Sequence, residues 1–237
     1  MSYRILVLVV MVAFAKALTA QTTVVELFTS QGCSSCPPAD ELLGEVQERY
    51  GDDVITLSYH VDYWDYIGWK DPFASNAYTQ KQYNYASAFG SRGVYTPQAV
   101  INGNSHFTGS DSRKMRVALE KNTLENNTTI TLGDFKNTGS KLWIPYTISD
   151  AVDSNNVTFA LTVKEKTTRV KRGENRNRTL TNHNIVIDEV SVASQKEGSI
   201  QLNIPGWVTD EDHLAVVAYV SKEQVGITSA IRKEYNR

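Results

Sequence analysis

The cysteine pair Cys33 and Cys36, separated by two serines, is the feature that most restricts how this chain can fold. The run before it, residues 22–28 (TTVVELF), is rich in β-branched side chains and predicts a strand. Two prolines follow the pair at once, and proline suits the first turn of a helix, where its missing N–H needs no partner. The apolar spacing beyond them predicts a helix that ends near Tyr50.

Residues 54–59 (VITLSY) read as a second strand, so the cysteines lie in the turn of a βαβ unit. A polar, aromatic segment over 60–72 comes next. The pattern after it predicts a helix over 73–89, a strand over 98–101, a hairpin turn at Asn102-Gly103, a strand over 105–108 and a helix over 111–126. These elements predict an α/β domain with a helical, aromatic-rich insert.

The pattern of residue types changes after residue 127. Alternating β-branched runs predict strands over 129–135, 141–149, 156–166, 184–193, 199–204 and 213–220. The expected fold class is therefore α/β, followed by an all-β, sandwich-like C-terminal region. We expect three parts: a signal peptide over 1–20, a first domain over 21–127 and a β-rich domain over 128–237. The tail 221–237 is compatible with a closing helix or a frayed end.

The N-terminus has the layout of a secretory signal peptide. Arg4 precedes an unbroken apolar run over 5–15, and small residues follow it, as such leaders require. The run is too short for a typical spanning helix, although an uncleaved anchor or a buried strand would also fit. We expect an exported protein, periplasmic or extracellular, that is not stably inserted in a membrane after cleavage.

An exported chain meets oxidising conditions, and its two cysteines are expected to form a disulfide. A bridge across two residues restricts the unfolded chain little, so it suits reversible exchange better than stabilisation. The helix N-terminus lowers the pKa of a thiol placed there. We predict that Cys33 is the exposed attacking thiol and that Cys36 is the buried resolving thiol. No cofactor beyond this disulfide is expected.

A second motif follows in the run Tyr95-Thr96-Pro97 and the strand after it. It resembles the segment of thioredoxins and glutaredoxins in which a cis proline precedes a strand and lies against the cysteine pair. The resemblance implies a cis Pro97 with a catalytic role, and implies that Thr96 and Tyr95 bind the backbone of an extended substrate. An ordinary edge-strand proline is the alternative.

Three further residues are candidate modulators of the thiols. His60 and Asp62 follow the second strand, at the sheet edge expected to hold the cysteine turn. His60 can shift the Cys33 pKa or carry a proton, or the two residues hold the loop that carries Trp64 and Trp69. Gln31 and the serine hydroxyls can donate hydrogen bonds to a thiolate, which would make the disulfide more oxidising.

The long runs over 26–40, 60–72, 94–98 and 173–184 (GENRNRTLTNHN) together resemble a family of secreted bacterial proteins. That family has a thioredoxin-like fold and is largely uncharacterised in function. The resemblance implies the fold, and implies redox activity only by analogy. The serines between the cysteines replace the Gly-Pro of thioredoxin, and Gly32 replaces its tryptophan, so the redox potential cannot be carried over.

The partners expected for such a site are protein thiols or disulfides. The formal net charge of −2 disfavours nucleic acid, because the only dense basic stretch is 168–178, which reads as a solvated hairpin tip. If the polar run 172–184 folds back toward the cysteines, Arg176, Arg178 or His183 can approach Cys33. The aromatic residues of the insert form either a groove for a partner or the insert's own core.

Three other functions remain open from the residues alone. A zinc site lacks a second cysteine pair, and the four histidines are scattered, so no metal ligands are assigned. A redox-inert or copper-handling module is the main alternative, since Cys33, Cys36 and His60 include soft ligands for Cu(I). The third is an interaction protein with a permanent disulfide.

Overall fold

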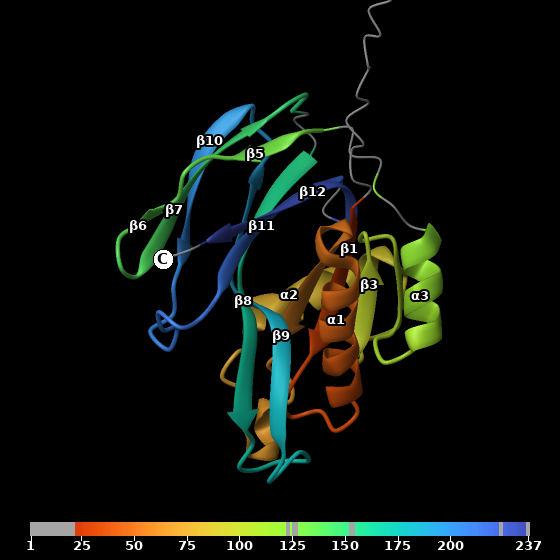
Figure 1. Cartoon of the computed structure of the whole chain (residues 1–237). Helices are drawn as coiled ribbons and strands as arrows, with labels where there is room; N and C mark the ends of the chain where they lie inside the picture. Colours follow the sequence, from red (N-terminus) through yellow and green to blue (C-terminus); the bar gives the residue numbers. More distant parts are fainter. Residues whose placement is uncertain (1–21, 122–123, 125–127, 152–154, 223–224, 236–237) are drawn as a thin grey trace, which may run out of the picture.

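The structure is a computed structural model that describes residues 22–121, 124, 128–151, 155–222 and 225–235. The expected signal peptide over 1–20 lies outside these residues. The fold is a mixed α/β fold with one large mixed sheet and few helices (Figure 1). The helices are α1 (Pro37–Tyr50), α2 (Asn76–Ala88) and α3 (Ser112–Lys121), with single 3-10 turns at Gly51–Asp53 and Asp65–Ile67.

Eight strands form the large sheet, in the order β12-β11-β8-β9-β2-β1-β3-β4. Their bounds are β1 (Thr23–Thr29), β2 (Val54–His60), β3 (Gln98–Ile101), β4 (Ser105–Thr108), β8 (Asn155–Arg169), β9 (Thr179–Ala193), β11 (Leu214–Lys222) and β12 (Gly226–Tyr235). A second sheet has the order β10-β7-β5, from β10 (Glu197–Asn203), β7 (Lys141–Ile148) and β5 (Ile130–Leu132), and the short β6 (Lys136–Asn137) pairs with β7.

The predicted strands and helices of the first half are confirmed within a few residues, except that α3 covers 112–121 and the predicted helix end at 126 lies outside the described residues. The hairpin at Asn102-Gly103 is also confirmed: both residues have positive φ, and three residues, 102–104, separate the paired Ile101 and Ser105. The tail is neither a helix nor a frayed end over its described part, because β12 pairs along β11. The C-terminal strands are divided between the sheets: β8, β9, β11 and β12 join the large sheet beside β2.

The pairing of three strands brings the candidate residues to one sheet edge. β1 and β2 are parallel, with Thr29 opposite His60, so both strands end together. β3 runs antiparallel to β1 with Gln98 opposite Phe28, so β3 begins where β1 ends. The cysteine turn after β1, His60 and Pro97 therefore share that edge.

Three apolar layers cover the sheets. Helices α1 and α3 pack their apolar faces on one side of β1 and β3, through residues such as Leu43 and Met115. Helix α2 packs on the opposite side, where Tyr78 and Tyr85 meet the β1 side chains Val24 and Phe28.

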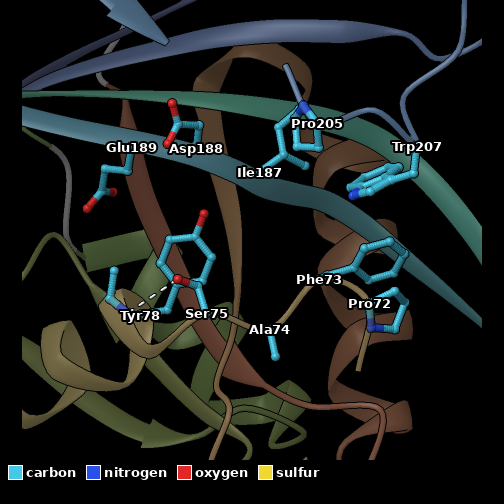
Figure 2. Close-up of a pocket in the computed structure, with 11 residues that line it drawn as sticks. Pro72, Phe73, Ala74, Ser75, Tyr78, Ile187, Asp188, Glu189, Pro205 and Trp207 are labelled. Carbon is cyan, nitrogen blue, oxygen red and sulfur yellow. Dashed lines mark hydrogen bonds between the residues drawn. The ribbon is translucent and has the colours of Figure 1, made fainter. Parts of the chain in front are cut away.

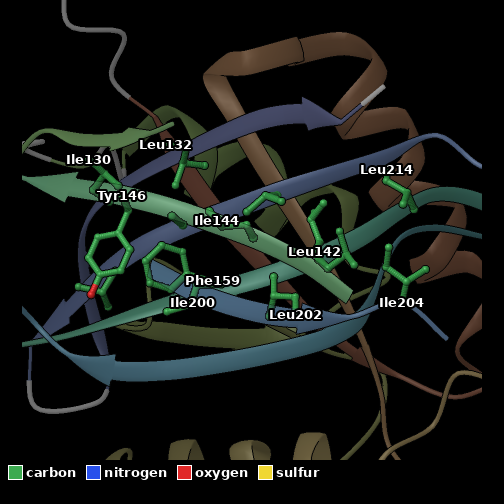
Figure 3. Close-up of a cluster of buried hydrophobic side chains, with 14 of the residues drawn as sticks. Ile130, Leu132, Leu142, Ile144, Tyr146, Phe159, Ile200, Leu202, Ile204 and Leu214 are labelled. Carbon is green, nitrogen blue, oxygen red and sulfur yellow. The ribbon is translucent and has the colours of Figure 1, made fainter. Parts of the chain in front are cut away.

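The third layer fills the space between the two sheets (Figure 3). Alternate residues of β8, such as Phe159 and Leu161, face the second sheet and meet Leu142 and Ile144 of β7. This layer is the core expected of a sandwich-like region.

β8 and β9 form a long antiparallel arm that runs past α1 (Figure 1). The arm crosses from the sandwich core to the sheet edge that holds the cysteine turn, because the β8–β9 loop, residues 170–178, contacts that turn. Among the described residues, no helix has the length and apolar character needed to cross a membrane.

Candidate functional site

Cys33 and Cys36 form a disulfide, with their Cα atoms 5.5 Å apart. The bridge lies in the turn between β1 and α1, and Cys36 is the residue that precedes the first helical turn. Both cysteines are 0% exposed, whereas Ser34 and Ser35 between them are exposed. The prediction that Cys33 is the exposed thiol is therefore wrong for this state of the protein, because other parts of the chain cover it.

The Ser35 hydroxyl lies 3.4 Å from Cys33 Sγ. It can donate to a thiolate there, as predicted for the serine hydroxyls. The Gln31 side chain is committed elsewhere, because its amide donates to Asn182 Oδ1 at 2.9 Å and its carbonyl accepts from Trp69 Nε1 at 3.2 Å. Gln31 therefore braces the turn rather than contacting sulfur.

His60 and Asp71 make a fully buried pair beneath the turn. His60 Nδ1 lies 2.7 Å from Asp71 Oδ2, and both side chains are 0% exposed. Burial disfavours the charged imidazole, but the Asp71 carboxylate outweighs it and raises the pKa of His60. Asp71 Oδ2 also accepts from Gln31 N at 2.7 Å, so the pair anchors the backbone that leads into Cys33.

Asp62 lies apart from this pair. Its carboxylate accepts from the Thr79 hydroxyl at 2.6 Å and its N–H donates to Thr79 Oγ1 at 3.1 Å. These bonds attach the segment after β2 to the first turn of α2.

Asp40 is an acid in the site that the sequence reasoning missed. It is 4% exposed, and its N–H donates to the Cys36 carbonyl, so the two side chains lie one helical turn apart on the same face. The Thr29 hydroxyl donates to Asp40 Oδ2 at 3.0 Å. Burial raises the pKa of Asp40 to about 6, against the opposing effects of the His60 charge and this hydroxyl.

Replacing Asp40 by asparagine should change how stability depends on pH. Its folded-state pKa of about 6 exceeds the ordinary 3.8, so folding favours the protonated form, and wild type loses stability as pH rises through this window. The difference corresponds to about 3 kcal/mol. Urea unfolding at pH 3 and at pH 8 measures this effect. Between these pH values the free energy of unfolding of Asp40→Asn should rise by about that amount relative to wild type.

The control for this prediction is Thr29→Val. It keeps the carboxyl but removes the hydroxyl that lowers the Asp40 pKa, so the pH-dependent step should persist and move to higher pH. Parallel stability curves for wild type and Asp40→Asn would show that Asp40 does not titrate in this window.

The Thr96–Pro97 peptide is cis, as the resemblance to thioredoxins implied. The side chains beside it already have partners: Thr96 Oγ1 accepts from Trp64 Nε1 at 2.8 Å, and Tyr95 OH lies 2.9 Å from His106 Nδ1. Trp64 also lies over Gly32, where an added Cβ would fall 2.9 Å from the Trp64 Cβ. The aromatic segment therefore forms one wall of the site.

The opposite wall comes from the run 173–184. It folds back to the cysteine turn, but through residues other than those predicted. Glu174 accepts from Ser34 N at 3.0 Å, and Asn175 Nδ2 donates to the carbonyls of Gln31 and Cys33, both at 2.9 Å. Arg178, one of the residues predicted to approach Cys33, instead donates a hydrogen bond to Asn175 Oδ1. His183, another of them, packs its ring on Gly44 of α1.

A separate pocket of about 220 Å³ lies between the start of α2 and β9 (Figure 2). Phe73 and Trp207 lie at one end, and Asp188 and Glu189 lie near the other. Neither cysteine lines it. Its link to the disulfide is indirect, through the Phe73 ring, which packs edge-on against His60 at 5.2 Å between centroids.

A buried charge cluster occupies the α2 side of the large sheet. Lys81 Nζ lies 3.1 Å from both Glu189 carboxylate oxygens and 3.4 Å from Glu26 Oε1, and it donates to Tyr219 OH at 2.6 Å. The Tyr85 hydroxyl donates to Glu26, which is 0% exposed. Burial raises the pKa of Glu26, although Lys81 opposes it.

Within the described part of the chain, no three His, Cys, Asp or Glu side chains are grouped so that they could hold a metal ion. His60, the histidine considered for copper, has its Nδ1 at Asp71, and its buried Nε2 has no hydrogen-bond partner among the described residues.

The chain is similar to a known protein family and to solved structures. Residues 24–221 match the family model described as "Protein of unknown function (DUF1223)". The crystal structure of protein AGR_C_4864 from Agrobacterium tumefaciens is 34% identical, over 89% of this chain and 92% of that one, with a TM-score of 0.64.

HBP35 of Porphyromonas gingivalis is 15% identical, over 90% of this chain and 74% of that one, with a TM-score of 0.54, which is a likeness of fold alone. No curated protein is detectably similar to the chain.

Proposed function

We propose that this chain, which belongs to the family described as "Protein of unknown function (DUF1223)", is an exported thiol–disulfide oxidoreductase built on a thioredoxin-like fold. One observation carries the proposal: the Cys33–Cys36 disulfide lies at the start of α1, and one helical turn after Cys36 is a buried carboxyl group, Asp40, whose pKa burial raises to about 6. A helix N-terminus favours a thiolate, and a buried acid can exchange a proton with one.

The arrangement of the first half supports the thioredoxin-like part of the proposal. The cysteine turn links β1 to α1, β2 lies parallel to β1, and β3 lies antiparallel on its other side. The cis Pro97 precedes β3 at the same sheet edge as the cysteines. The apolar run at the N-terminus supports export, and therefore a periplasmic or extracellular location.

The proposed reaction moves two electrons from a partner dithiol to the disulfide. A partner thiolate attacks Cys33 Sγ, the S–S bond breaks, and Cys36 leaves as a thiolate that takes a proton from Asp40. The second partner thiol then loses its proton to water, and the resulting thiolate attacks the partner sulfur of the mixed disulfide. Cys33 is released as a thiolate, so the partner is oxidised and the pair is reduced. The reverse sequence reduces a partner disulfide.

The surroundings of Cys33 favour an oxidising disulfide. The Ser35 hydroxyl lies 3.4 Å from its sulfur, and a hydrogen bond from it stabilises the thiolate and so the reduced pair. We expect a reduction potential less negative than the roughly −270 mV of thioredoxin. The substrates are protein thiols or disulfides, and the reaction needs no cofactor besides the cysteine pair.

The test is equilibration of the purified protein in glutathione buffers, with the thiols counted by alkylation and mass spectrometry. A reversible two-electron transition is expected for wild type. Cys36→Ser should accumulate mixed disulfides on Cys33, because the resolving thiol is missing, whereas Cys33→Ser should accumulate far fewer. The absence of a transition in wild type across the accessible range would rule out the oxidoreductase.

A further inference from the structure

The β8–β9 loop, residues 170–178, lies directly on the cysteine turn. Glu174 Oε2 accepts from Ser34 N at 3.0 Å, and the Ser34 hydroxyl and N–H lower the pKa of Glu174. Asn175 is 1% exposed, and its Nδ2 donates to Gln31 O and Cys33 O at 2.9 Å each. Three hydrogen bonds therefore join two segments that are about 140 residues apart in sequence.

The loop is shaped for this position. Arg178 donates to Asn175 Oδ1 at 2.9 Å, which orients the amide so that its nitrogen faces the turn. Gly173 and Asn177 have positive φ, which bends the loop back between the two strands. A Cβ on Gly173 would fall 3.1 Å from Ile67 Cδ1, so the loop also closes against the wall formed by the aromatic segment.

The consequence for the disulfide is loss of access. Both cysteines are 0% exposed, although the two serines between them face solvent. A thiolate must approach Cys33 Sγ in line with the S–S bond, and exchange rates depend on such access. A Cys33 residue with no exposed surface is therefore incompatible with the attack step, and the loop bonded to its carbonyl is one of the segments that enclose it.

We propose that the loop 170–178 is a movable cover, closed by Glu174 and Asn175, that must leave the Cys33–Cys36 disulfide before a partner can react. This inference rests on the proposed function, because it concerns how partners reach that same disulfide. The cover leaves by breaking three hydrogen bonds, while the β8 and β9 strands behind it stay paired in the sheet.

The main-chain groups of the cysteine turn that the cover binds indicate which kind of partner takes its place. Asn175 presents a carboxamide N–H to two main-chain carbonyls, and Glu174 presents an oxygen to a main-chain N–H. An extended polypeptide offers the same donors and acceptors along its backbone. The cover therefore imitates a bound segment, and the partner is a cysteine-containing polypeptide that takes over the bonds of Glu174 and Asn175.

The experiment measures the second-order rate constant for reduction of the disulfide by dithiothreitol, with acid quench, alkylation and mass spectrometry. Asn175→Ala removes two of the three bonds and should raise the rate constant about tenfold, since loss of about 1.4 kcal/mol of closed-state stability is a tenfold change. Glu174→Gln keeps an acceptor but loses the charge, so a smaller increase is expected. Because Glu174 is exposed, this variant should unfold at the wild-type urea concentration.

The matched control is Arg176→Ala. Arg176 belongs to the same loop and is exposed, and its side chain makes no hydrogen bond or ion pair in the part of the chain that the structure describes. Its rate constant should equal that of wild type. In the mixed disulfide of Cys36→Ser with a short cysteine peptide, amide hydrogens of residues 170–178 should exchange faster than in the free protein.

The outcomes separate the two proposals. Wild-type rates in both Asn175→Ala and Glu174→Gln, or an equal increase in Arg176→Ala, overturn the cover even when glutathione equilibration shows a reversible disulfide. A disulfide that resists reduction in wild type and in both variants overturns the cover and the proposed function together. Acceleration confined to the Glu174 and Asn175 variants supports the cover.

Discussion

Replacing Lys81 by methionine should lower the free energy of unfolding by about 3–5 kcal/mol at pH 7. The ammonium group is the cation between Glu26 and Glu189, at 3.4 Å and 3.1 Å, and it also lies 4.7 Å from the centre of the Tyr59 ring. Burial lowers the pKa of Lys81, but these carboxylates outweigh it and raise that pKa well above the ordinary value. Methionine keeps the volume and leaves two carboxylates uncompensated.

The loss of unfolding free energy in Lys81→Met should depend on pH. Burial already raises the pKa of Glu26, and loss of Lys81 raises it further, so the ionised form costs more in the folded state. Stability of Lys81→Met is therefore lost as pH rises through the raised pKa of Glu26, and its difference from wild type in free energy of unfolding narrows as pH falls back through that pKa. Urea unfolding at several pH values measures it.

Two further variants decide the interpretation. Lys114→Met removes an exposed lysine, 3.7 Å from Asp111, and should stay within about 0.5 kcal/mol of wild type. Adding Glu26→Gln to Lys81→Met should recover part of the loss, because one buried charge disappears. A Lys81→Met protein within about 1 kcal/mol of wild type at pH 7 would show that the cluster is solvated rather than buried.

Replacing Phe159 by alanine should lower the free energy of unfolding by about 3–5 kcal/mol. Its ring is 0% exposed between the two sheets and packs 4.7 Å from the Tyr146 ring, measured between centroids. The substitution leaves a cavity in the layer that joins β8 to the second sheet. The more conservative Phe159→Leu fills part of this space and should lose less.

This variant also tests whether the two halves unfold together. Trp64 and Trp69 contact Gly32 and Gln31 of the cysteine turn, and Trp143 and Trp207 lie in the C-terminal half. If strands 128–237 unfold with the first half as one unit, fluorescence and the rate of disulfide reduction should report the same shifted midpoint in Phe159→Ala. Separate midpoints would establish two independently unfolding domains.

The local elements could be predicted because their causes are local. The strand before Cys33, the helix opened by the prolines and the Asn102-Gly103 hairpin depend on neighbouring residues, and the structure has all three. The cis Thr96–Pro97 peptide came from resemblance and is also present.

The long-range features could not be predicted in the same way. Asp40 reads as one more acid near the start of a helix, and its perturbed pKa arises only when β1, β2 and α1 enclose it. The residues around Glu174 and Asn175 do not indicate a contact with the cysteine turn, because the local sequence does not determine where the β8–β9 arm packs. Cys33 is buried by long-range contacts that its neighbours in the sequence do not determine, which is why its predicted exposure was wrong.

The sequence separation of the cover from the cysteines sets an order of events during synthesis. Cys33 and Cys36 emerge from the ribosome about 140 residues before Glu174 and Asn175, and β1 and α1 can form from local contacts by then. The three hydrogen bonds that join the loop to the cysteine turn can form only after residues 174 and 175 have been synthesised. The turn is therefore made long before the residues of its proposed cover exist.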